Sequence, residues 1–524
     1  MSNSQIVEKT SLTKLINLSN RQFIDSEKHE QKIIGQFFTP PAIALFMAKQ
    51  FSYNKKHISI LDPGSGTGIL TAAICDRILA LGDKKNIDVH FYENDSFVLP
   101  ILNKNATDLK TEMESFGHIF QYKIFSEDFV SKNSKYINGD SLFSDTSNKP
   151  EYDIIISNPP YYKLKKSDIL SRKMKDIVHG QPNIYSFFMA ISACLLKKNG
   201  ELVFITPRSF CSGTYFKMFR KWFLNQVKPI FIHSFESRKE IFENGVLQET
   251  IILKATKTKN EPSKLVISSS NNSDFEQSKI LVQGYSTLIN CHDSESIIHI
   301  PTNNQDIKIL EMVRSWKKTF TDYGFRISTG PIVSFRASKF LKKEVSIENS
   351  SLVPLFWMNH LKNFTIEYPK KELDKPQSVV VNDDSFKILL KNRNYVFVKR
   401  FSSKEQKKRV YASFYDKDTF NTNYIGVENH LNYIWKPTGE LSTTESLGIM
   451  AILNSTIIDK FFRIINGNTQ VNASEINNLP FPAYDEIISI GKEIKTQNNF
   501  NLDIIDSVVT EKLSIPYEIW GHYN

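Results

Sequence analysis

From residue 58 to about residue 254, short β-rich runs alternate with stretches of helical character. The β-rich runs cover residues 58–61, 88–92, 153–157, 201–205 and 230–235. The helical stretches between them include residues 69–81, 184–196 and 214–224. Strands that alternate with helices in this way form a parallel sheet that helices cover on both faces. The sequence therefore predicts an α/β domain in this part of the chain.

The rest of the chain differs from this pattern on both sides. Residues 1–34 are polar and predict an N-terminal helical extension. Residues 255–274 are rich in polar and turn-forming residues, so we place a domain boundary after residue 275. Past about residue 290, aromatic, basic and asparagine-rich strands dominate, and we expect residues 276–524 to form a second domain of α+β type.

Charge and cysteine content restrict the partners of the chain. A formal charge of +10 favours a polyanionic partner, although many basic proteins never bind nucleic acid. The four cysteines are scattered and lack zinc-finger spacing, so we expect neither disulfides nor a metal site. The N-terminus lacks the apolar core of a signal peptide, and no apolar run is long enough to span a bilayer. We therefore expect a cytoplasmic protein without membrane contacts.

A glycine-rich loop follows the first β-rich run, in the sequence ILDPGSGTG over residues 60–68. Gly64, Gly66 and Gly68 let the backbone pass close to a ligand, and their GxGxG spacing differs from the GxGxxG of dinucleotide binders. Asp62, just before the glycines, would repel a phosphate and attract the ammonium of a methionine moiety. Alone, the motif also fits a tight strand–helix turn without a ligand.

An acidic residue, Glu93, ends the next β-rich run in the sequence HFYEND. An acid at this place can accept both ribose hydroxyls of a nucleoside, as in dinucleotide-binding folds. A single acid at a strand end is more often only solvated. Together with the glycine loop, however, Glu93 predicts a nucleoside site.

The third motif, Asn158-Pro159-Pro160-Tyr161, ends the buried run of YDIIISNPPYYKL over residues 152–164. Two prolines remove two N–H donors and fix the backbone, which leaves carbonyl groups pointing outward. The Asn158 side-chain oxygen and the Pro159 carbonyl could each accept one N–H of a planar primary amine, and Tyr161 could stack on its ring. The alternative is a proline-terminated strand that only leads into a loop.

An aromatic amine is a poor nucleophile because its lone pair is delocalised into the ring. Two acceptors can draw its hydrogens out of the ring plane and localise the lone pair. Transfer of a methyl group to it would then be a direct in-line displacement that depends on positioning and electrostatics.

The order of the motifs resembles that of the gamma-class adenine-N6 DNA methyltransferases of bacterial restriction–modification systems, the TaqI-like methylases. Besides the three motifs above, the matching segments are GQFFTPPAIALFMAKQF at 35–51, SEDF at 126–129, NIYSFFMAISACLLKKNGELVFITPRSF at 183–210 and FENGVLQETIIL at 242–253. The resemblance implies a Rossmann-like S-adenosylmethionine-dependent methyltransferase domain over residues 35–275. It also implies an α+β target-recognition domain over residues 276–524.

The resemblance further implies roles for single residues in cofactor binding. The cofactor, S-adenosylmethionine, would contact Thr39, Asp62, Gly64, Gly66, Glu93, Asp128, Phe129 and Asn158. Thr39 and Asp62 would lie at its methionine end and Glu93 at its ribose. Asp128, or its rival Asp140 in INGDSLF, would accept the amine of the cofactor's adenine.

The same resemblance assigns the target base. Asn158, Pro159 and Tyr161 would hold an adenine that is flipped out of the DNA duplex. Phe242 would stack on the other face of this base, unless it is a core aromatic at the start of a strand.

Two basic clusters fit contacts with DNA phosphates, although each is also compatible with a solvated charged face. The first follows the NPPY motif and comprises Lys163, Lys165, Lys166, Arg172, Lys173 and Lys175. The second comprises Lys399, Arg400, Lys404, Lys407, Lys408 and Arg409. Segments 324–337, 353–361, 399–409 and 466–482 resemble the recognition regions of separate methylases. We expect double-stranded DNA as the partner, a monomer on DNA, and a separately encoded cognate endonuclease.

Other readings of the motifs are less consistent with the residues. No Pro-Cys dipeptide is present, which excludes cytosine-C5 methylation, and cytosine-N4 methylases usually have Ser in place of Asn158. RNA and protein N-methyltransferases also carry NPPY but typically lack so large a C-terminal region. A catalytically inactive DNA-binding relative is a further alternative, against which the intact Asp62, Gly64, Glu93 and Asn158 argue. Because the methylase motifs begin near residue 35, we do not expect a fused nuclease before them.

Overall fold

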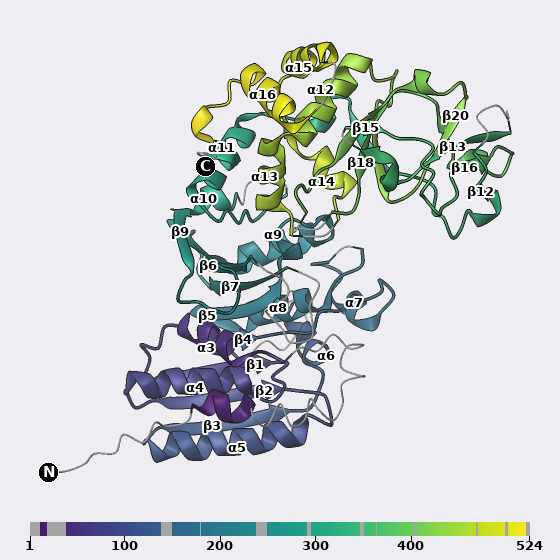
Figure 1. The fold of residues 1–524 in the computed structure, drawn as a ribbon. Coiled ribbons are helices and arrows are strands. Elements are labelled where there is room, and N and C mark those ends of the chain that lie inside the picture. Colours follow the sequence, from purple (N-terminus) through teal and green to yellow (C-terminus); the bar gives the residue numbers. More distant parts are fainter. Residues whose placement is uncertain are drawn as a thin grey trace. The chain divides into compact units, whose positions relative to one another are not determined.

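The computed structural model describes residues 11–17, 38–137, 149–178, 180–236, 249–290, 295–345, 351–362, 364–402, 406–467, 470–497 and 501–519. The chain forms two compact units, Met1–Thr302 and Asn303–Asn524, which are called unit 1 and unit 2. Each unit has its own sheets and helices (Figure 1). None of the described helices is long and apolar enough to cross a membrane.

Unit 1 contains a nine-stranded sheet in the order β3-β2-β1-β4-β5-β7-β6-β8-β9. Its strands are β1 (His57–Pro63), β2 (Asn86–Tyr92), β3 (Ile119–Phe125), β4 (Tyr152–Ser157), β5 (Leu196–Pro207), β6 (Lys228–Phe235), β7 (Thr250–Thr256), β8 (Lys264–Ser270) and β9 (Lys279–Gly284). Strands β1 to β5 pair in parallel, whereas β7 is antiparallel to β5 and β6, and β9 is antiparallel to β8. The parallel half brings the carboxyl ends of β1, β2 and β4 to one edge.

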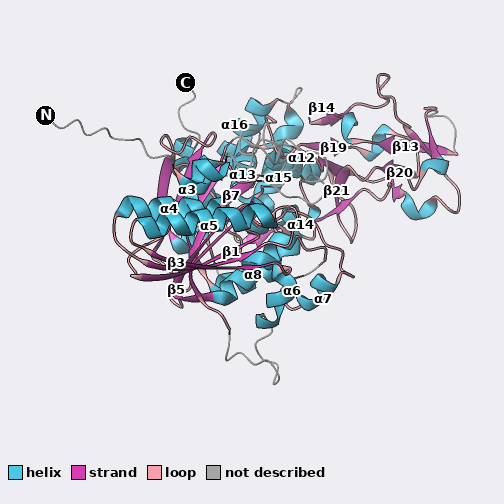
Figure 2. Ribbon diagram, turned by 90° about the horizontal axis from the view of Figure 1, so that it is seen from below, coloured by secondary structure: helices cyan, strands magenta, loops and turns pink. Residues whose placement is uncertain are grey.

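Helices cover both faces of this sheet, as Figure 2 shows, with α3, α4 and α5 on one face and α6 and α8 on the other. Besides a short helical stretch at residues 12–17, the described helices of unit 1 are α3 (Pro41–Lys49), α4 (Ile69–Leu81), α5 (Leu99–Ser115), α6 (Phe129–Asn133), α7 (Ile169–Lys173), α8 (Ile184–Leu195), α9 (Lys217–Gln226) and α10 (Tyr285–Leu288). Helix α4 is apolar on almost all sides because it packs against α3, α5 and β4. It begins after Gly68 and ends at Gly82, both of which have positive φ angles.

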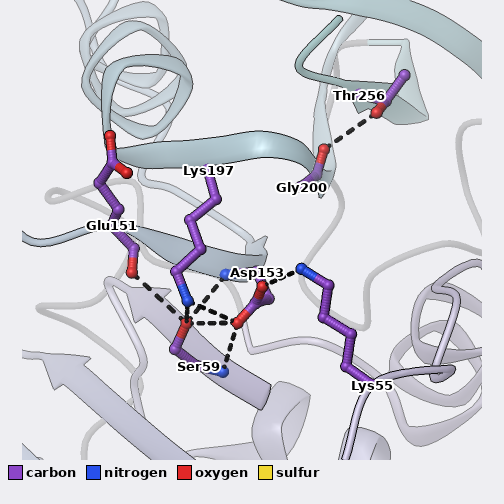
Figure 3. A network of polar contacts seen from close by, with 7 residues as sticks. All are labelled: Lys55, Ser59, Glu151, Asp153, Lys197, Gly200 and Thr256. Carbon is purple, nitrogen blue, oxygen red and sulfur yellow. Dashed lines mark hydrogen bonds and ion pairs between the residues drawn. The ribbon is translucent and has the colours of Figure 1, made fainter. Parts of the chain in front are cut away.

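A charged network ties β1, β4 and β5 together at the amino end of β4 (Figure 3). The buried Asp153 carboxylate accepts hydrogen bonds from Lys55 Nζ (2.5 Å), Lys197 Nζ (2.9 Å) and Ser59 Oγ (2.8 Å). Burial raises the pKa of Asp153, but the hydrogen bonds from the two lysines and Ser59 outweigh burial and hold it below its ordinary value. The network holds β1, β4 and β5 together at one end of the sheet. It thereby helps to fix the carboxyl ends of these strands at the opposite end.

The predicted helices and strands of the α/β domain are present. The five predicted strands correspond to β1, β2, β4, β5 and β6, and the predicted helices correspond to α4, α8 and α9 with the short turn before it. An α/β sheet with helices on both faces is therefore confirmed, but it is parallel only through β5, because β7 enters antiparallel between β5 and β6 and makes the sheet mixed. Strands β3, β7, β8 and β9 are missing from the prediction.

The domain boundary lies later than predicted. The polar stretch 255–274 is not a break, because it contains β8, whose Leu265 and Ile267 are buried in the sheet. The hairpin of β8 and β9 spans residue 275, and the two units divide between Thr302 and Asn303. Of the expected N-terminal extension, residues 12–17 are helical, and Asp76 of α4 accepts hydrogen bonds from the backbone N–H groups of Leu12 and Thr13. The other residues of the 1–34 segment, apart from residue 11, lie outside the described ranges.

Unit 2 combines small sheets with a group of helices. A four-stranded sheet has the order β11-β21-β18-β19, a five-stranded sheet has the order β12-β16-β13-β20-β17, and β10 with β22 and β14 with β15 form pairs. The strands are β10 (Lys318–Thr319), β11 (Arg326–Thr329), β12 (Leu341–Lys342), β13 (Leu352–Phe356), β14 (Leu361–Lys362), β15 (Thr365–Ile366), β16 (Ser378–Val380), β17 (Leu390–Lys391), β18 (Tyr395–Lys399), β19 (Ala412–Tyr415), β20 (Tyr424–Val427), β21 (Leu431–Trp435) and β22 (Pro480–Phe481).

The helices of unit 2 are α11 (Asn304–Ser315), α12 (Thr443–Asn454), α13 (Thr456–Ile465), α14 (Ala473–Asn477), α15 (Tyr484–Thr496) and α16 (Leu502–Lys512). Helices α12 and α15 cross at two glycines. A Cβ atom on Gly491 would lie 1.9 Å from the carbonyl oxygen of Thr444, and one on Gly448 would lie 2.1 Å from that of Ile487. The two backbones can approach this closely only because neither glycine has a side chain.

Candidate active site at the carboxyl edge of the sheet

The glycine loop, Glu93 and the NPPY motif all follow the carboxyl ends of neighbouring strands. β1 pairs with β2 on one side and with β4 on the other, so the three motifs meet at the point where the strand order reverses. In open α/β sheets, ligands bind at such a switch point. Ser157, the last residue of β4, donates a hydrogen bond from its hydroxyl to the carbonyl of Pro63 (2.7 Å) and joins two of the motifs directly.

The glycine loop rests on the end of β2. The backbone N–H groups of Gly64 and Ser65 both donate to the carbonyl of Tyr92, at 2.9 Å each. Gly64 and Gly66 have φ angles of +68° and +54°, which residues with a side chain rarely adopt. A Cβ atom on Gly66 would meet no described atom within 4 Å, so the backbone here faces open space. The loop thus offers its main chain to a ligand.

Asp62 is fully buried beneath this loop. One carboxylate oxygen accepts a hydrogen bond from Thr71 Oγ1 (2.8 Å), whereas Oδ1 has no hydrogen-bond partner among the described residues. Burial raises the pKa of Asp62 to about 8, because the charged form is poorly solvated. A buried acceptor without a partner is costly, and a cation that reached Oδ1 would remove this cost. The geometry therefore fits the ammonium group that the sequence predicts here.

Glu93 is buried next to the glycine loop and is held by two backbone donors. Its Oε2 accepts from the N–H of Gly66 (2.8 Å) and its Oε1 from the N–H of Asp95 (2.9 Å). Burial raises the pKa of Glu93, and these two hydrogen bonds oppose the shift. Each carboxylate oxygen has a further lone pair, so a fixed Glu93 could still accept hydroxyl groups.

The predicted adenine-binding residues stand at the start of α6. Asp128 caps this helix and accepts a hydrogen bond from the N–H of Ser131 (2.6 Å). Phe129 is buried, with its ring centroid 5.1 Å from that of Tyr92, which directly precedes Glu93. The rival residue, Asp140, lies outside the described residues. Asp128 and Phe129 therefore extend the row of motifs beyond β2.

One residue of this region is not among the predicted ones. The ring of Phe188, in α8, lies 5.1 Å from the ring of Phe129 by centroids, and a Cβ atom on Gly64 would lie 3.3 Å from it. Phe188 therefore packs between the glycine loop and α6. The aromatic pair in NIYSFF was visible in the sequence, but a helix with this many apolar residues does not indicate which of them faces a site.

At the NPPY motif, two side chains hold the Asn158 amide. Asn158 Nδ2 donates to Thr39 Oγ1 (3.0 Å), and the hydroxyl of Tyr161 donates to Asn158 Oδ1 (2.7 Å). Thr39 comes from the segment just before α3, so the structure brings together residues that are 119 positions apart. In this arrangement the nitrogen of the amide faces Thr39 and its oxygen faces Tyr161.

Tyr161 itself is only 8% exposed, and its hydroxyl also lies 2.9 Å from the carbonyl of Ile205. The phenol has a single hydrogen, so the two acceptors compete for it. Burial raises the pKa of Tyr161, and the hydroxyl keeps this hydrogen. Stacking of the buried Tyr161 ring on a base stays a prediction. A role for the buried Pro159 in holding the base also stays a prediction. Phe242 lies outside the described residues.

The first basic cluster is exposed throughout: Lys163, Lys165, Lys166, Arg172, Lys173 and Lys175. The residues of the second cluster differ in their exposure to solvent. Lys407 is exposed, Lys399 and Arg400 are half-buried, and Lys404 lies outside the described residues.

The prediction of phosphate contacts is wrong for Lys408 and Arg409, which are both buried. Lys408 Nζ donates to the carbonyl of Asn454, and Arg409 Nε donates to Ser402 Oγ (3.2 Å). The backbone N–H of Arg409 donates to Asp459 of α13. A run of basic residues looks like a surface in the sequence, but here the chain turns inward and the helices supply the acceptors.

Similarity to solved structures agrees with this architecture. The type IIL restriction-modification enzyme MmeI, solved in complex with DNA, aligns with 98% of this chain and 76% of its own length, with a TM-score of 0.57 and 12% sequence identity. At this identity the likeness concerns the fold alone. Sheet order and the position of the glycine loop define a Rossmann-like methyltransferase domain, as expected from the sequence.

Sequence relatives narrow this class. Residues 70–242 match the family described as Eco57I restriction-modification methylase. The chain is 35% identical to the type II methyltransferase M.BsuBI of Bacillus subtilis, over 92% of this chain and 94% of the relative. It is 33% identical to the type II methyltransferase M.PstI of Providencia stuartii, over 92% of this chain and 93% of that relative. The chain belongs to the type II methyltransferases of restriction–modification systems and is a DNA methyltransferase.

Proposed function

We propose that the protein methylates the exocyclic N6 amine of adenine in double-stranded DNA, with S-adenosylmethionine as the methyl donor. The observation that carries the proposal is the Asn158 amide, which Thr39 and Tyr161 hold from both ends beside the glycine loop. An amide fixed in this way presents an oxygen acceptor for an amine N–H. We further propose that the protein is the modification enzyme of a type II system.

The donor set at the edge of the sheet fits the cofactor. Asp62 offers a buried oxygen, without a described partner, to an ammonium group, and Glu93 offers two fixed oxygens to ribose hydroxyls. The open space at Gly66 leaves room for a ligand along the loop. Asp128 and Phe129 would hold the adenine of the cofactor, and Thr39 would lie at its methionine end. When bound, S-adenosylmethionine supplies a methyl group on a sulfonium centre.

The target amine would be held by Asn158 Oδ1 and the carbonyl of Pro159. Each oxygen accepts one N–H, which draws the hydrogens out of the ring plane and directs the nitrogen lone pair away from the ring. Because neither group is a strong base, their contribution is orientation and electrostatic stabilisation of the charge that develops on the nitrogen. The base must leave the duplex stack to reach them, so we propose that it is flipped.

Tyr161 would adjust to the incoming base. Its hydroxyl can turn from Asn158 Oδ1 to the carbonyl of Ile205, which is also within hydrogen-bond distance at 2.9 Å. This rotation of the hydroxyl exchanges one hydrogen bond for another, and Asn158 Oδ1 is then available to the amine. Asn158 Nδ2 stays on Thr39 meanwhile, so the amide keeps its orientation.

Sequencing of genomic DNA from a methylation-free host that expresses the protein tests the proposal. We expect N6-methyladenine in one short sequence motif, which also gives the recognition site. An Asn158→Ala variant expressed to the same level should leave the DNA unmodified while binding S-adenosylmethionine with nearly unchanged affinity in calorimetry.

Absence of modified adenine, from protein that binds S-adenosylmethionine, would contradict the proposal and favour RNA or protein as the substrate. Equal modification by the Asn158→Ala variant would contradict the role of Asn158. A separately encoded endonuclease and a monomeric enzyme on DNA are further parts of the proposal. Size-exclusion chromatography with light scattering on a duplex that carries the motif tests the second of these.

A further inference from the structure

Four segments that are far apart in the sequence meet at one edge of the four-stranded sheet in unit 2. β11 ends at Thr329, β18 ends at Lys399 and β21 begins at Leu431, and the pairs Thr329↔Asn432 and Lys399↔Leu431 align these ends. The fourth segment joins through Val471, whose N–H donates to the carbonyl of Arg400 (2.8 Å). Its carbonyl accepts from Asn432 Nδ2 (2.9 Å). The loops of these segments are called the recognition edge.

The turn that follows β11 is held rigidly at this edge. A Cβ atom on Gly330 would lie 2.3 Å from the carbonyl oxygen of Glu428, so the chain passes in direct backbone contact with the loop before β21. Ile332 and Ala337 are both buried in a hydrophobic cluster. Between them the N–H groups of Arg336 and Ala337 close the turn by donating to the carbonyl of Val333, at 2.9 and 3.0 Å.

Phe335 lies at the tip of this anchored turn and is 75% exposed, more than any other large apolar side chain of the described residues. The guanidinium of Arg336 lies 5.4 Å from the centroid of its ring. A single exposed apolar residue is common on protein surfaces. Here, however, buried residues on both sides of the turn hold the ring outward, and a cation stands beside it.

A second group of aromatic and cationic side chains lies at the same edge. The Arg400 guanidinium is 5.6 Å from the centroid of the Phe401 ring, and the ring of the exposed His430 is 5.0 Å from that of Phe401. The carboxylate of Glu428 is buried and bonded to His430. Among the described residues of its loops, the recognition edge exposes rings and cations, and the carboxylate of Glu428 is buried.

We infer that the recognition edge of unit 2 binds duplex DNA, with Phe335 inserted at a base step and Arg336 and Arg400 on the phosphates. Cations provide the charge complement of a phosphate backbone, and exposed apolar rings are used to enter base stacks and kink the duplex. A flat ring can contact any base, whereas guanidinium groups that bind phosphates fix the position of the protein along the duplex. The inference rests on the proposed DNA substrate and names the surface that contacts it.

The test compares full-length Phe335→Ala with the wild type and with Ile280→Ala. Ile280 is 71% exposed on β9 of unit 1 and serves as a matched apolar surface control. Fluorescence anisotropy with a duplex that carries the methylated motif should show that Phe335→Ala binds about tenfold more weakly than the wild type. The control should bind with the wild-type affinity. The slope of affinity against salt should stay the same for Phe335→Ala, because no cation is lost, and should fall by about one for Arg336→Gln.

The outcomes separate the two proposals. Wild-type affinity and wild-type KM for DNA in Phe335→Ala would overturn the inference while leaving adenine methylation untouched. Tighter binding of single-stranded RNA than of duplex DNA, with the same dependence on Phe335, would also overturn it. A separate measurement tests the proposed function. If the genomic DNA of a host that expresses the wild-type protein contains no N6-methyladenine, the proposed function is contradicted. Unchanged S-adenosylmethionine affinity and melting temperature show that Phe335→Ala remains folded.

Discussion

At the scale of single residues, hydrogen bonds from distant segments decide the chemistry of the site. Asn158 carries an amide with a donor end and an acceptor end, and Thr39 and Tyr161, from distant and nearby segments, contact these two ends. Asp62 shows the same dependence on surroundings. Among the described residues its hydrogen-bond partner is Thr71, and burial rather than a neighbouring charge is the largest cause of its raised pKa. Both features follow from contacts across the fold.

Thr39→Val removes the hydroxyl that accepts from Asn158 Nδ2 while it keeps the shape of the side chain. The amide of Asn158 would then turn between two orientations, and only one of them presents the oxygen. We expect kcat to fall about tenfold, the equivalent of one hydrogen bond, with little change in the KM for DNA. Single-turnover and steady-state assays of methyl transfer measure this.

Thr39→Ser keeps the acceptor and should restore kcat to near the wild-type value. A Thr39→Val variant with unchanged kcat but weaker S-adenosylmethionine binding would contradict the positioning role. Such a result would favour the direct cofactor contact that the resemblance implies.

Asp62 should make the stability of the cofactor-free protein depend on pH. Because burial raises its pKa to about 8, the folded state keeps a proton that the unfolded state loses near its ordinary pKa of 3.8. The free energy of unfolding should therefore fall as the pH rises between these two values, by at most about 1.4 kcal/mol per pH unit. Asp62→Asn should remove this contribution and be relatively more stable than the wild type above pH 8, in urea unfolding across the range.

Asp108→Asn, on the exposed surface of α5, is the control. Parallel stability curves for Asp62→Asn and the wild type would show that Asp62 does not hold an extra proton in the folded state. Saturating S-adenosylmethionine should flatten the wild-type curve, because a bound ammonium favours the charged carboxylate.

At the scale of helices and strands, close backbone contacts hold the elements that the sequence pattern alone leaves loosely defined. In unit 1, β7 enters antiparallel between β5 and β6, and the polar segment 255–274 supplies β8. In unit 2, α12 and α15 meet through Gly448 and Gly491. These contacts form between segments that are distant or that look like linkers, so periodicity alone does not predict them.

Gly491→Ala tests the crossing of α12 and α15. Its Cβ atom would lie 1.9 Å from the carbonyl oxygen of Thr444, and a backbone atom cannot turn away as a side chain can. We expect the free energy of unfolding to drop by about 3 kcal/mol, as for strong overpacking. Urea unfolding followed by circular dichroism gives the value.

Gly284→Ala is the matched control, because its Cβ atom would approach only Thr287 Oγ1, at 3.4 Å. It should change the stability by less than about 0.5 kcal/mol. If both alanine variants unfold at the wild-type urea concentration, α12 and α15 are not held at this distance in solution.

At the scale of the whole molecule, the net charge of +10 says little about where a polyanion binds. The exposed lysines after the NPPY motif belong to unit 1, and the exposed Lys407 belongs to unit 2. Arg409, by contrast, contributes to the formal charge while being fully buried. Only the exposed cations are available for counterion release on DNA.

Neutralising two exposed lysines should therefore have a different effect from neutralising a buried arginine. Lys165→Gln with Lys166→Gln should lower the slope of log affinity against log salt by about one to two, at unchanged melting temperature. Arg409→Gln should lower the melting temperature, because it removes the donor to Ser402 Oγ. Its salt slope, measured on the folded protein by anisotropy, should match that of the wild type. If Arg409→Gln lowered the slope of log affinity against log salt more than the lysine variant does, the assignment of DNA contacts to the exposed lysines would be contradicted.

The sequence by itself determined β1, β2, β4 and β5 of the parallel half, α4 and α8, and the family. Local physics is sufficient there: buried central strands are continuous apolar runs, and strand–loop–helix motifs place Asp62, Glu93 and Asn158 at the ends of consecutive strands of a parallel sheet. Similarity over nearly the whole chain then places it among the type II methyltransferases.

Only the tertiary structure decided which side chains are buried and with which partners. The bond between Thr39 and Asn158, the burial of Lys408 and Arg409, and the meeting of four segments at the recognition edge all depend on residues that the sequence keeps apart or leaves unmarked. The physical reason is that burial and hydrogen bonding depend on what packs against a residue. Periodicity and composition report only which residues follow one another along the chain.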